Sequence, residues 1–499
     1  MANAPTLSAA ERKLVDSVPT GLFINGEWRP ARDGGTLTVT DPSSGGTLTE
    51  IASATVEDGA LALEAAAAAQ YDWGRAAPRE RGEILRRAFE AVTSRLEDFA
   101  LLMTLEMGKT LAESRAEAAY GAEFLRWFSE EAARVSGRFG TAPDGHNRIL
   151  VAKRPVGPAL LITPWNFPLA MATRKIGPAI AAGCTVILKP AAQTPLTALL
   201  FTQILSEAGL PRGVVNVIPT LHAGQVTGPL ISDPRLRKLS FTGSTEVGQA
   251  LMRQAADQVL RISMELGGNA PLLVFDDADL DLAVEGALQA KFRNNGEACT
   301  AANRILVQDG VAEEFIRRFT AEVSKYTIAR GTDPKANIGP LVDQATLDKV
   351  KDLVDGALED GATLALGGHA VDGAGYFFEP TVLTKVPAGA RILEQEIFGP
   401  VAPIVTFGTE CEAIRLANNT GFGLVAYAFT RDLNRGLRLA EEIESGMLGL
   451  NAGVVSNPAA PFGGVKLSGI GREGGAEGIE EYLETKYVGI ANPHMPAAS

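Results

Sequence analysis

The stretch VGPALLITPWNFP (156–168), continued by a helical segment at 174–182 and by TVILKP (185–190), decides the fold. An apolar strand, a helix and a second apolar strand follow one another, which is the pattern of a parallel βαβ unit. The alternation continues through strands 214–218, 238–241 and 260–264 and helices 195–208, 222–231 and 244–255. Repeated units of this length predict an α/β fold with a parallel sheet covered by helices on both faces.

A second α/β segment begins near residue 270. It comprises strands 270–275, 304–308, 363–367, 402–406 and 426–429 and helices 279–293, 312–329, 345–361, 411–418 and 434–444. Outside the two segments, we expect a polar arm or short helix at 1–20, strand–turn–strand units at 21–30 and 37–51, helices at 56–71, from 78 and at 111–133, a hairpin at 136–153 and an extended tail at 480–492. The length of 499 residues fits two or three domains.

Polar loops follow three strands of the first predicted sheet: TPWNFP (163–168), LKPA (188–191) and FTGS (241–244). Ligands on such sheets bind at the carboxyl ends of the strands. FTGS also opens a helix, whose free N–H groups can hold a phosphate. We therefore expect a ligand site at this edge.

The charge and composition exclude several partners. The net charge is −13 with no basic run, which argues against nucleic acid and anionic membranes. No apolar run is long enough to span a membrane, and no signal-peptide pattern begins the chain. Four scattered His without CxxC or HxxxH spacing predict no metal site. Three scattered Cys predict a reducing, cytoplasmic location.

One cysteine lies in an unusual setting, KFRNNGEACTAANRILV (291–307). A polar turn leads into Cys299 and a β-rich run follows. Free backbone N–H groups at such an element end favour a thiolate and a negatively charged transition state. A lone Cys is more often a small buried apolar residue, so this stretch alone leaves both interpretations open.

The segment GIGREG (469–474) matches GxGxxG. A dinucleotide fingerprint needs a strand before it and a helix after it. Here the glycine-rich PFGGVKLSG (461–469) precedes it, which predicts a mobile loop rather than a phosphate site.

Seven motifs in order resemble the aldehyde dehydrogenase superfamily over nearly the whole chain. They are PWNFP (164–168), LKPAAQTP (188–195), FTGSTEVG (241–248), ELGGNAP (265–271), GEAC (296–299), QEIFGP (395–400) and PFGGVKLSG (461–469). The resemblance implies a dinucleotide-binding domain (1–135 and 154–266) and a catalytic domain (267–458). It also implies an oligomerisation hairpin, active-site loop and C-terminal strand (136–153 and 459–499), in a homodimer or homotetramer.

The resemblance assigns three catalytic residues, and chemistry supports each of them. Cys299 attacks the aldehyde carbon, because a thiolate is a strong nucleophile. The Asn166 amide and the Cys299 backbone N–H stabilise the oxyanion, and Glu265 activates water to hydrolyse the thioester. Without the resemblance, Asn166 is equally well a turn residue and Glu265 a solvated acid at a strand end.

The resemblance also implies NADP as cofactor, with NAD possible. The matching positions are Trp165, Asn166, Lys175, Lys189, Ala192, Gly243, Ser244, Leu266, Glu396 and Phe398. Lys189 and Glu396 would hold the riboses, and Lys175 would contact the nicotinamide side. NAD-preferring relatives often carry Glu three positions after the lysine. Ala192 stands there instead and leaves no carboxylate to repel a 2′-phosphate.

Arg174, Arg293 and Ser456 resemble the substrate positions of succinate-semialdehyde enzymes within the superfamily. Two Arg and a hydroxyl suit a carboxylate clamp, although either Arg alone is more often a solvated residue. The implied substrate is succinate semialdehyde or a similar carboxylated aldehyde such as glutarate semialdehyde. A non-catalytic use of the fold and acyl transfer to coenzyme A are alternatives; the catalytic residues and Glu265 argue against them. One departure is Glu297, where Gln is common, because a charge there would raise the Cys299 pKa.

Overall fold

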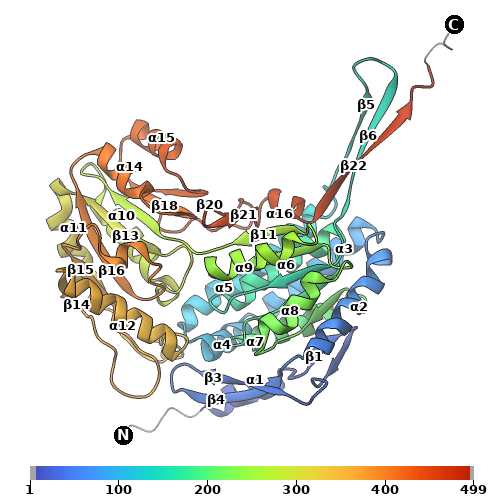
Figure 1. Cartoon of the computed structure of the whole chain (residues 1–499). Helices are drawn as coiled ribbons and strands as arrows, with labels where there is room; N and C mark the ends of the chain where they lie inside the picture. Colours follow the sequence, from blue (N-terminus) through green and yellow to red (C-terminus); the bar gives the residue numbers. More distant parts are fainter. Residues whose placement is uncertain (1–6, 495–499) are drawn as a thin grey trace.

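Two β-sheets form the body of the molecule, and helices cover both faces of each (Figure 1). The fold is a computed structural model, which describes residues 7–494. The first sheet has the order β2-β1-β9-β8-β7-β10-β11-β21. Its strands are β1 (Leu22–Ile24), β2 (Glu27–Arg29), β7 (Ala159–Ile162), β8 (Val186–Lys189), β9 (Val215–Val217), β10 (Lys238–Thr242), β11 (Arg261–Glu265) and β21 (Gly469–Ile470). Strands β7 to β11 are parallel, so the predicted α/β sheet is confirmed.

The helices of this half are α1 (Ala9–Ser17), α2 (Val56–Trp73), α3 (Pro78–Ser94), α4 (Leu96–Met107), α5 (Leu111–Glu131), α6 (Pro168–Ala182), α7 (Pro195–Glu207), α8 (Ala223–Ser232) and α9 (Thr245–Ala256). Of the predicted arm 1–20, residues 1–6 lie outside the described residues. Helix α6 begins six residues before the predicted 174, because Pro168 occupies the first position, where no N–H donor is needed. All of α6 is buried.

The second sheet has the order β14-β15-β16-β13-β12-β18-β19. Its strands are β12 (Ala270–Val274), β13 (Ala302–Gln308), β14 (Thr363–Leu366), β15 (Thr381–Thr384), β16 (Val401–Phe407), β18 (Val425–Phe429) and β19 (Met447–Leu450). Its helices are α10 (Leu280–Phe292), the 3-10 turn η1 (Arg293–Gly296), α11 (Asp309–Val323), α12 (Gln344–Glu359), α13 (Arg391–Glu394), α14 (Glu410–Asn418) and α15 (Leu433–Glu442). The short strands β15 and β19 were not predicted, because neither has a long apolar run.

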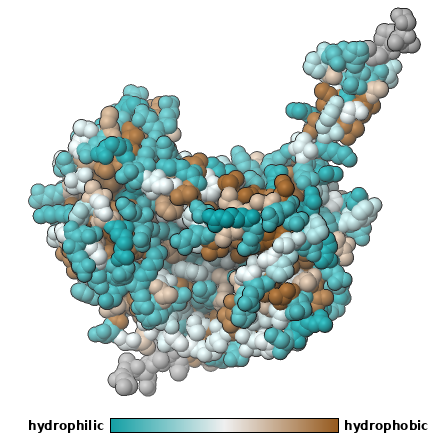
Figure 2. All heavy atoms as spheres, viewed as in Figure 1, coloured by the Kyte–Doolittle hydropathy of each residue, from teal (hydrophilic) through white to brown (hydrophobic). Residues whose placement is uncertain are grey.

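A three-stranded sheet projects from the body beside the C-terminus (Figure 1). It pairs β5 (Arg138–Thr141) and β6 (Asn147–Pro155), the predicted hairpin, with β22 (Leu483–Ala491) from the predicted extended tail. Apolar side chains are exposed along it (Figure 2), among them Phe139 at 66% and Tyr487 at 60%. Both lie on an element that no other part of the described chain covers. The small pairs β3 (Thr36–Asp41) with β4 (Gly46–Ala52) and β17 (Phe422–Gly423) with β20 (Val465–Lys466), and helix α16 (Glu477–Glu480), complete the structure.

The prediction of a mobile loop at 469–474 is wrong. Residues 469–470 form β21, which pairs antiparallel with β11 at the edge of the first sheet. Gly469 has φ of +119°, and a Cβ there would lie 1.9 Å from the carbonyl oxygen of Met264. The glycine therefore permits close strand approach, which the GxGxxG pattern alone does not distinguish from a phosphate loop.

Candidate active site

A cavity of about 200 Å³ lies where loops of the first sheet face the second. It is lined by Pro164, Trp165, Asn166, Thr242, Gly243, Ser244, Glu265, Leu266, Gly267, Cys299, Thr346, Lys349, Glu396 and Phe398. Nine of these were predicted site residues: Trp165, Asn166, Gly243, Ser244, Glu265, Leu266, Cys299, Glu396 and Phe398. Thr346 and Lys349 were missed, because they extend from the first turns of α12, which carries no motif.

Cys299 follows η1, in which Asn294 and Asn295 both adopt φ of +57°. A Cβ on the adjacent Gly296 would lie 2.2 Å from the carbonyl oxygen of Gly399, and one on Gly268 would lie 2.5 Å from that of Cys299. Both glycines are thus required for the close packing of the cysteine turn. No acceptor in residues 7–494 takes the backbone N–H of Cys299, which leaves that donor available beside the thiol.

Glu265 ends β11 and lines the same cavity as Cys299. Its Oε2 accepts a hydrogen bond from Arg174 Nη2 at 3.1 Å, while Oε1 has no partner among the described residues. Burial raises the Glu265 pKa, and the Arg174 charge partly opposes the rise. Burial and then the charge of Glu265 hold the pKa of Cys299 well above its ordinary value, again opposed by Arg174. A negative charge on either group therefore disfavours a negative charge on the other.

The expected effect of Glu297 on the thiol is corrected by the structure. Burial raises the Glu297 pKa well above its ordinary value, which favours the neutral form of this carboxyl group. Its Oε1 accepts the N–H of Val342 at 3.1 Å. The carboxylates that raise the Cys299 pKa are those of Glu265 and Glu396.

Asn166 lies in the loop after β7 and is fixed from several sides. Its Nδ2 donates to the carbonyl of Glu297 at 3.1 Å, and its Oδ1 is buried without a partner among residues 7–494. Its own carbonyl accepts from Lys109 Nζ at 2.9 Å and from Asn294 Nδ2 at 3.1 Å. Lys109 is fully buried and also donates to Asn294 Oδ1 at 2.6 Å. This lysine, missed from the sequence, connects the Asn166 loop to the cysteine turn.

A buried group of four charged side chains lies near Cys299. Glu473, from the GxGxxG segment, forms ion pairs with both Arg174 and Lys175 of α6. Although burial acts against it, these two cations lower the Glu473 pKa. With Glu265, the group contains two cations and two carboxylates and is electrically balanced.

Two predictions about α6 need correction. Lys175 does not line the cavity: its Nζ donates to Ser240 Oγ at 3.0 Å and pairs with Glu473, so it is not free to contact a nicotinamide. Arg174 is 1% exposed and already paired with Glu265 and Glu473. It is therefore not an unpaired cation of a carboxylate clamp. Both residues face inward because α6 is buried on all sides, which two neighbouring cations in a sequence do not suggest.

The predicted cofactor residues divide into two groups. Trp165 and Phe398 pack edge to face with centroids 5.4 Å apart, and Glu396 Oε1 accepts the N–H of Gly268 at 3.1 Å. Burial raises the Glu396 pKa to about 7. Lys189 and Ala192 do not line the 200 Å³ cavity; Lys189 ends β8 and Ala192 follows it, beside the loop that carries Trp165. Burial lowers the Lys189 pKa to about 8.

Arg293 and Ser456 lie on the other side of the cysteine turn. Arg293 is half-buried, donates to Thr300 Oγ1 at 3.2 Å and lies 5.5 Å from the centre of the Phe167 ring. It forms no ion pair within 4 Å among residues 7–494. Ser456, in the loop after β19, lies near the hydroxyl of Tyr120, a residue missed from the sequence.

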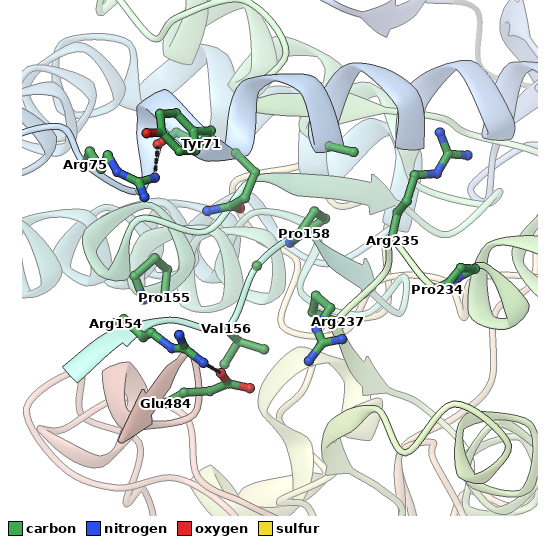
Figure 3. Close-up of a pocket in the computed structure, with 14 residues that line it drawn as sticks. Tyr71, Arg75, Arg154, Pro155, Val156, Pro158, Pro234, Arg235, Arg237 and Glu484 are labelled. Carbon is green, nitrogen blue, oxygen red and sulfur yellow. Dashed lines mark hydrogen bonds and ion pairs between the residues drawn. The ribbon is translucent and has the colours of Figure 1, made fainter. Parts of the chain in front are cut away.

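A larger cavity lies elsewhere. It measures about 710 Å³ and lies at the base of the projecting sheet (Figure 3). Its labelled residues include Arg75, Arg235 and Arg237, and an Arg154–Glu484 ion pair at 3.3 Å. None of the predicted site residues lines it.

The sequence model of the aldehyde dehydrogenase family matches residues 28–488, and the chain belongs to this family. A protein of Paenarthrobacter nicotinovorans named succinate-semialdehyde dehydrogenase is 63% identical over 447 residues, covering 90% of this chain and 99% of that protein. Escherichia coli (strain K12) succinate-semialdehyde dehydrogenase (NADP+) GabD is 49% identical over 468 residues, covering 94% and 97%.

Solved structures agree with this assignment. The crystal structure of an E. coli NADP-dependent enzyme superposes with a TM-score of 0.94 at 46% identity, covering 97% of this chain and all of that one. Betaine aldehyde dehydrogenase from Staphylococcus aureus, in complex with NAD+, superposes with a TM-score of 0.95 at 34% identity, covering 98% of both chains. Within residues 7–494, no helix is long and apolar enough to cross a membrane, and no cluster of three His, Cys, Asp or Glu could hold a metal ion.

Proposed function

We propose that this chain oxidises succinate semialdehyde to succinate with NADP, through a thioester on Cys299. The observation that carries the substrate is Arg293, a half-buried cation six residues before Cys299 that has no ion-pair partner in the described chain. A cation in that state attracts a carboxylate, since the bound pair satisfies both charges. The two relatives named succinate-semialdehyde dehydrogenase support the choice.

The covalent step uses the groups around Cys299. The Cys299 thiol, which lines the same cavity as Glu265, releases its proton to solvent, and the sulfur attacks the aldehyde carbon. The oxyanion that forms accepts a hydrogen bond from the free N–H of Cys299. The Asn166 amide nitrogen has two N–H donors; one of them donates to the Glu297 carbonyl at 3.1 Å, and the other is available as a second donor to the oxyanion. Each such donor is typically worth about 3–4 kcal/mol.

Glu265 acts in the second half of the reaction. Its Oε1 has no partner and is free to accept a proton from a water molecule that attacks the thioester. Arg174, Lys175 and Glu473 together carry one net positive charge, which compensates the charge of this carboxylate in the interior. Arg174 thereby positions the base rather than the substrate carboxylate.

The residues present fit a dinucleotide phosphate. Ser244 caps the N-terminus of α9, where backbone N–H groups favour an anion. A Cβ on Gly243 would lie 2.5 Å from the Phe241 ring, so this glycine allows the loop to turn tightly beside the helix. Glu396 and Lys189 would hold the ribose hydroxyls, and Trp165 and Phe398 would limit the cavity. When bound, NADP supplies the hydride acceptor.

Ala192→Glu should reverse the cofactor preference. The new carboxylate would lie three residues past Lys189, where it repels a 2′-phosphate but accepts hydrogen bonds from a ribose diol. Like-charge contacts cost several kcal/mol, so we expect kcat/KM with NADP to fall at least about 100-fold and that with NAD to rise. Initial rates with both nucleotides measure the ratio, and the surface change Ala256→Glu is the control. A wild type that prefers NAD would contradict the assignment.

Arg293→Ala tests the substrate. We expect kcat/KM with succinate semialdehyde to fall by about 2–4 kcal/mol, the range for truncating one side of a buried charge pair. Butanal, which has no carboxylate, should lose less than about threefold. Arg317→Ala, at an exposed pair with Glu314, is the matched control. An equal loss for the two aldehydes would show that Arg293 only supports the turn.

The main alternative substrate is glutarate semialdehyde. A Pseudomonas putida (strain KT2440) relative named glutarate-semialdehyde dehydrogenase is 48% identical over 472 residues, covering 94% of this chain and 97% of that protein. The same cation would bind the longer substrate. A panel from propanal to glutarate semialdehyde, with and without coenzyme A, separates the two substrates and also tests the acylating and non-catalytic alternatives.

The domain boundaries given above, a homodimer or homotetramer and a cytoplasmic location belong to the same proposal. The exposed Phe139 and Tyr487 of the projecting sheet support self-association, because such a sheet has no core of its own. Unpaired Cys184, Cys299 and Cys411 suit a reducing compartment.

A further inference from the structure

Tyr120 brings a hydroxyl group to the region of Arg293 and Ser456. It lies on α5, and its ring packs edge to face against Phe124 with centroids 4.9 Å apart. The ring also lies against an apolar cluster of Phe167, Ala170, Met171 and Ala298. Because Ala298 precedes Cys299, this cluster connects the nucleophile to the tyrosine.

The hydroxyl of Tyr120 is buried and makes no hydrogen bond of acceptable geometry with the described residues. Burial raises its pKa, opposed by the nearby charges of Arg174 and Arg293 and by Ser456. The phenol therefore remains protonated at neutral pH. A buried donor without a partner costs about 1–3 kcal/mol of stability. The presence of this hydroxyl in the interior therefore indicates that a bound group accepts its hydrogen bond.

The neighbours of the hydroxyl limit what that acceptor is. Arginine side chains only donate hydrogen bonds. The Tyr120 oxygen therefore directs its lone pairs toward Arg174 and Arg293, and its O–H bond points away from them. Arg174 is already neutralised by Glu265 and Glu473, whereas Arg293 is not. An acceptor that enters here thus meets one unpaired cation and two hydroxyl groups, which is a set suited to a carboxylate.

We infer that Tyr120 is a substrate-binding residue whose hydroxyl donates a hydrogen bond to the carboxylate of the semialdehyde, beside Arg293 and Ser456. The inference rests on the proposed function and deepens it. In this arrangement the apolar cluster surrounds the methylene groups while the aldehyde carbon reaches Cys299. Tyr120 takes the place in the clamp that the sequence assigned to Arg174.

The test is Tyr120→Phe in the full chain with NADP, which removes one oxygen and keeps the ring against Phe124. We expect kcat/KM for succinate semialdehyde to fall about 10- to 100-fold, the range for a hydrogen bond to a charged group, mainly through KM. Butanal should change less than about twofold. The inhibition constant of succinate should weaken by a similar factor, which measures carboxylate binding without the chemistry. Tyr487→Phe, on the projecting sheet, is the matched control and should change none of these values.

The outcomes separate the two claims. A wild type that does not prefer succinate semialdehyde to butanal overturns the proposed function and this inference together. A wild-type preference that survives in Tyr120→Phe overturns the inference alone. Equal losses for both aldehydes, with unchanged succinate inhibition, show that Tyr120 only packs and likewise overturn it.

Discussion

Cys299→Ala should lower the turnover of succinate semialdehyde by at least about 10⁴-fold, by comparison with removal of the nucleophile from other covalent enzymes. No other cysteine can substitute. Cys184 is buried at the start of β8, where its thiol donates to the carbonyl of Tyr482 and burial raises its pKa to about 11. Cys411 is exposed on α14. The fold should be unaffected, since Cys299 belongs to none of the buried cores.

Stopped-flow absorbance of reduced nucleotide measures this effect, because the variant should lose the initial burst as well as the steady rate. Cys411→Ala is the matched control and should retain both. In the wild type, alkylation of Cys299 by iodoacetamide, at one equivalent per chain, should inactivate the enzyme. Substantial burst formation by Cys299→Ala would refute the thioester mechanism.

Glu265→Gln should reduce the steady-state rate by about 10²–10⁴-fold, the usual range for a general base, while a burst of reduced nucleotide remains. Hydride transfer precedes thioester hydrolysis, so the amide should arrest the enzyme as an acylated chain that mass spectrometry detects. Loss of the burst together with turnover would place the need for Glu265 at thiol activation instead. The exposed Glu441→Gln is the control.

The same variant tests the pH dependence. Because burial raises the Glu265 pKa above its ordinary value, the base is protonated, and activity is lost, as the pH falls through that raised value. The wild-type rate should therefore decline on the acid side at a higher pH than an exposed glutamate would give. Residual hydrolysis by Glu265→Gln should lack this limb. A wild-type rate that is independent of pH on the acid side would contradict the assignment of Glu265 as base.

The sequence predicted the cavity wherever a residue ends a strand of a parallel sheet. Asn166, Gly243 and Glu265 lie at such ends, and the sheet brings them together. Lys349, Tyr120 and Lys109 could not be found in this way, because they reach the site from helices whose orientation depends on tertiary packing. Glu473 was misjudged for a related reason: a glycine pattern describes the backbone, whereas the function of this carboxylate depends on α6, about 300 residues earlier in the sequence.

Glu473 also sets the order in which the enzyme can mature during translation. Arg174 and Lys175 leave the ribosome roughly 300 residues before it and Glu265 roughly 200 residues before it, delays of about 10–60 s at a synthesis rate of ~5–20 residues per second. Until then the two cations of α6 have only Glu265 to neutralise them, and the first sheet lacks its edge strand β21. Docking of α6 before that point would leave one excess positive charge in the interior. The charged group beside the nucleophile is complete only when the last thirty or so residues have been synthesised. Premature termination just before Glu473 therefore yields a chain that has Cys299 but lacks the carboxylate that pairs with Arg174 and Lys175.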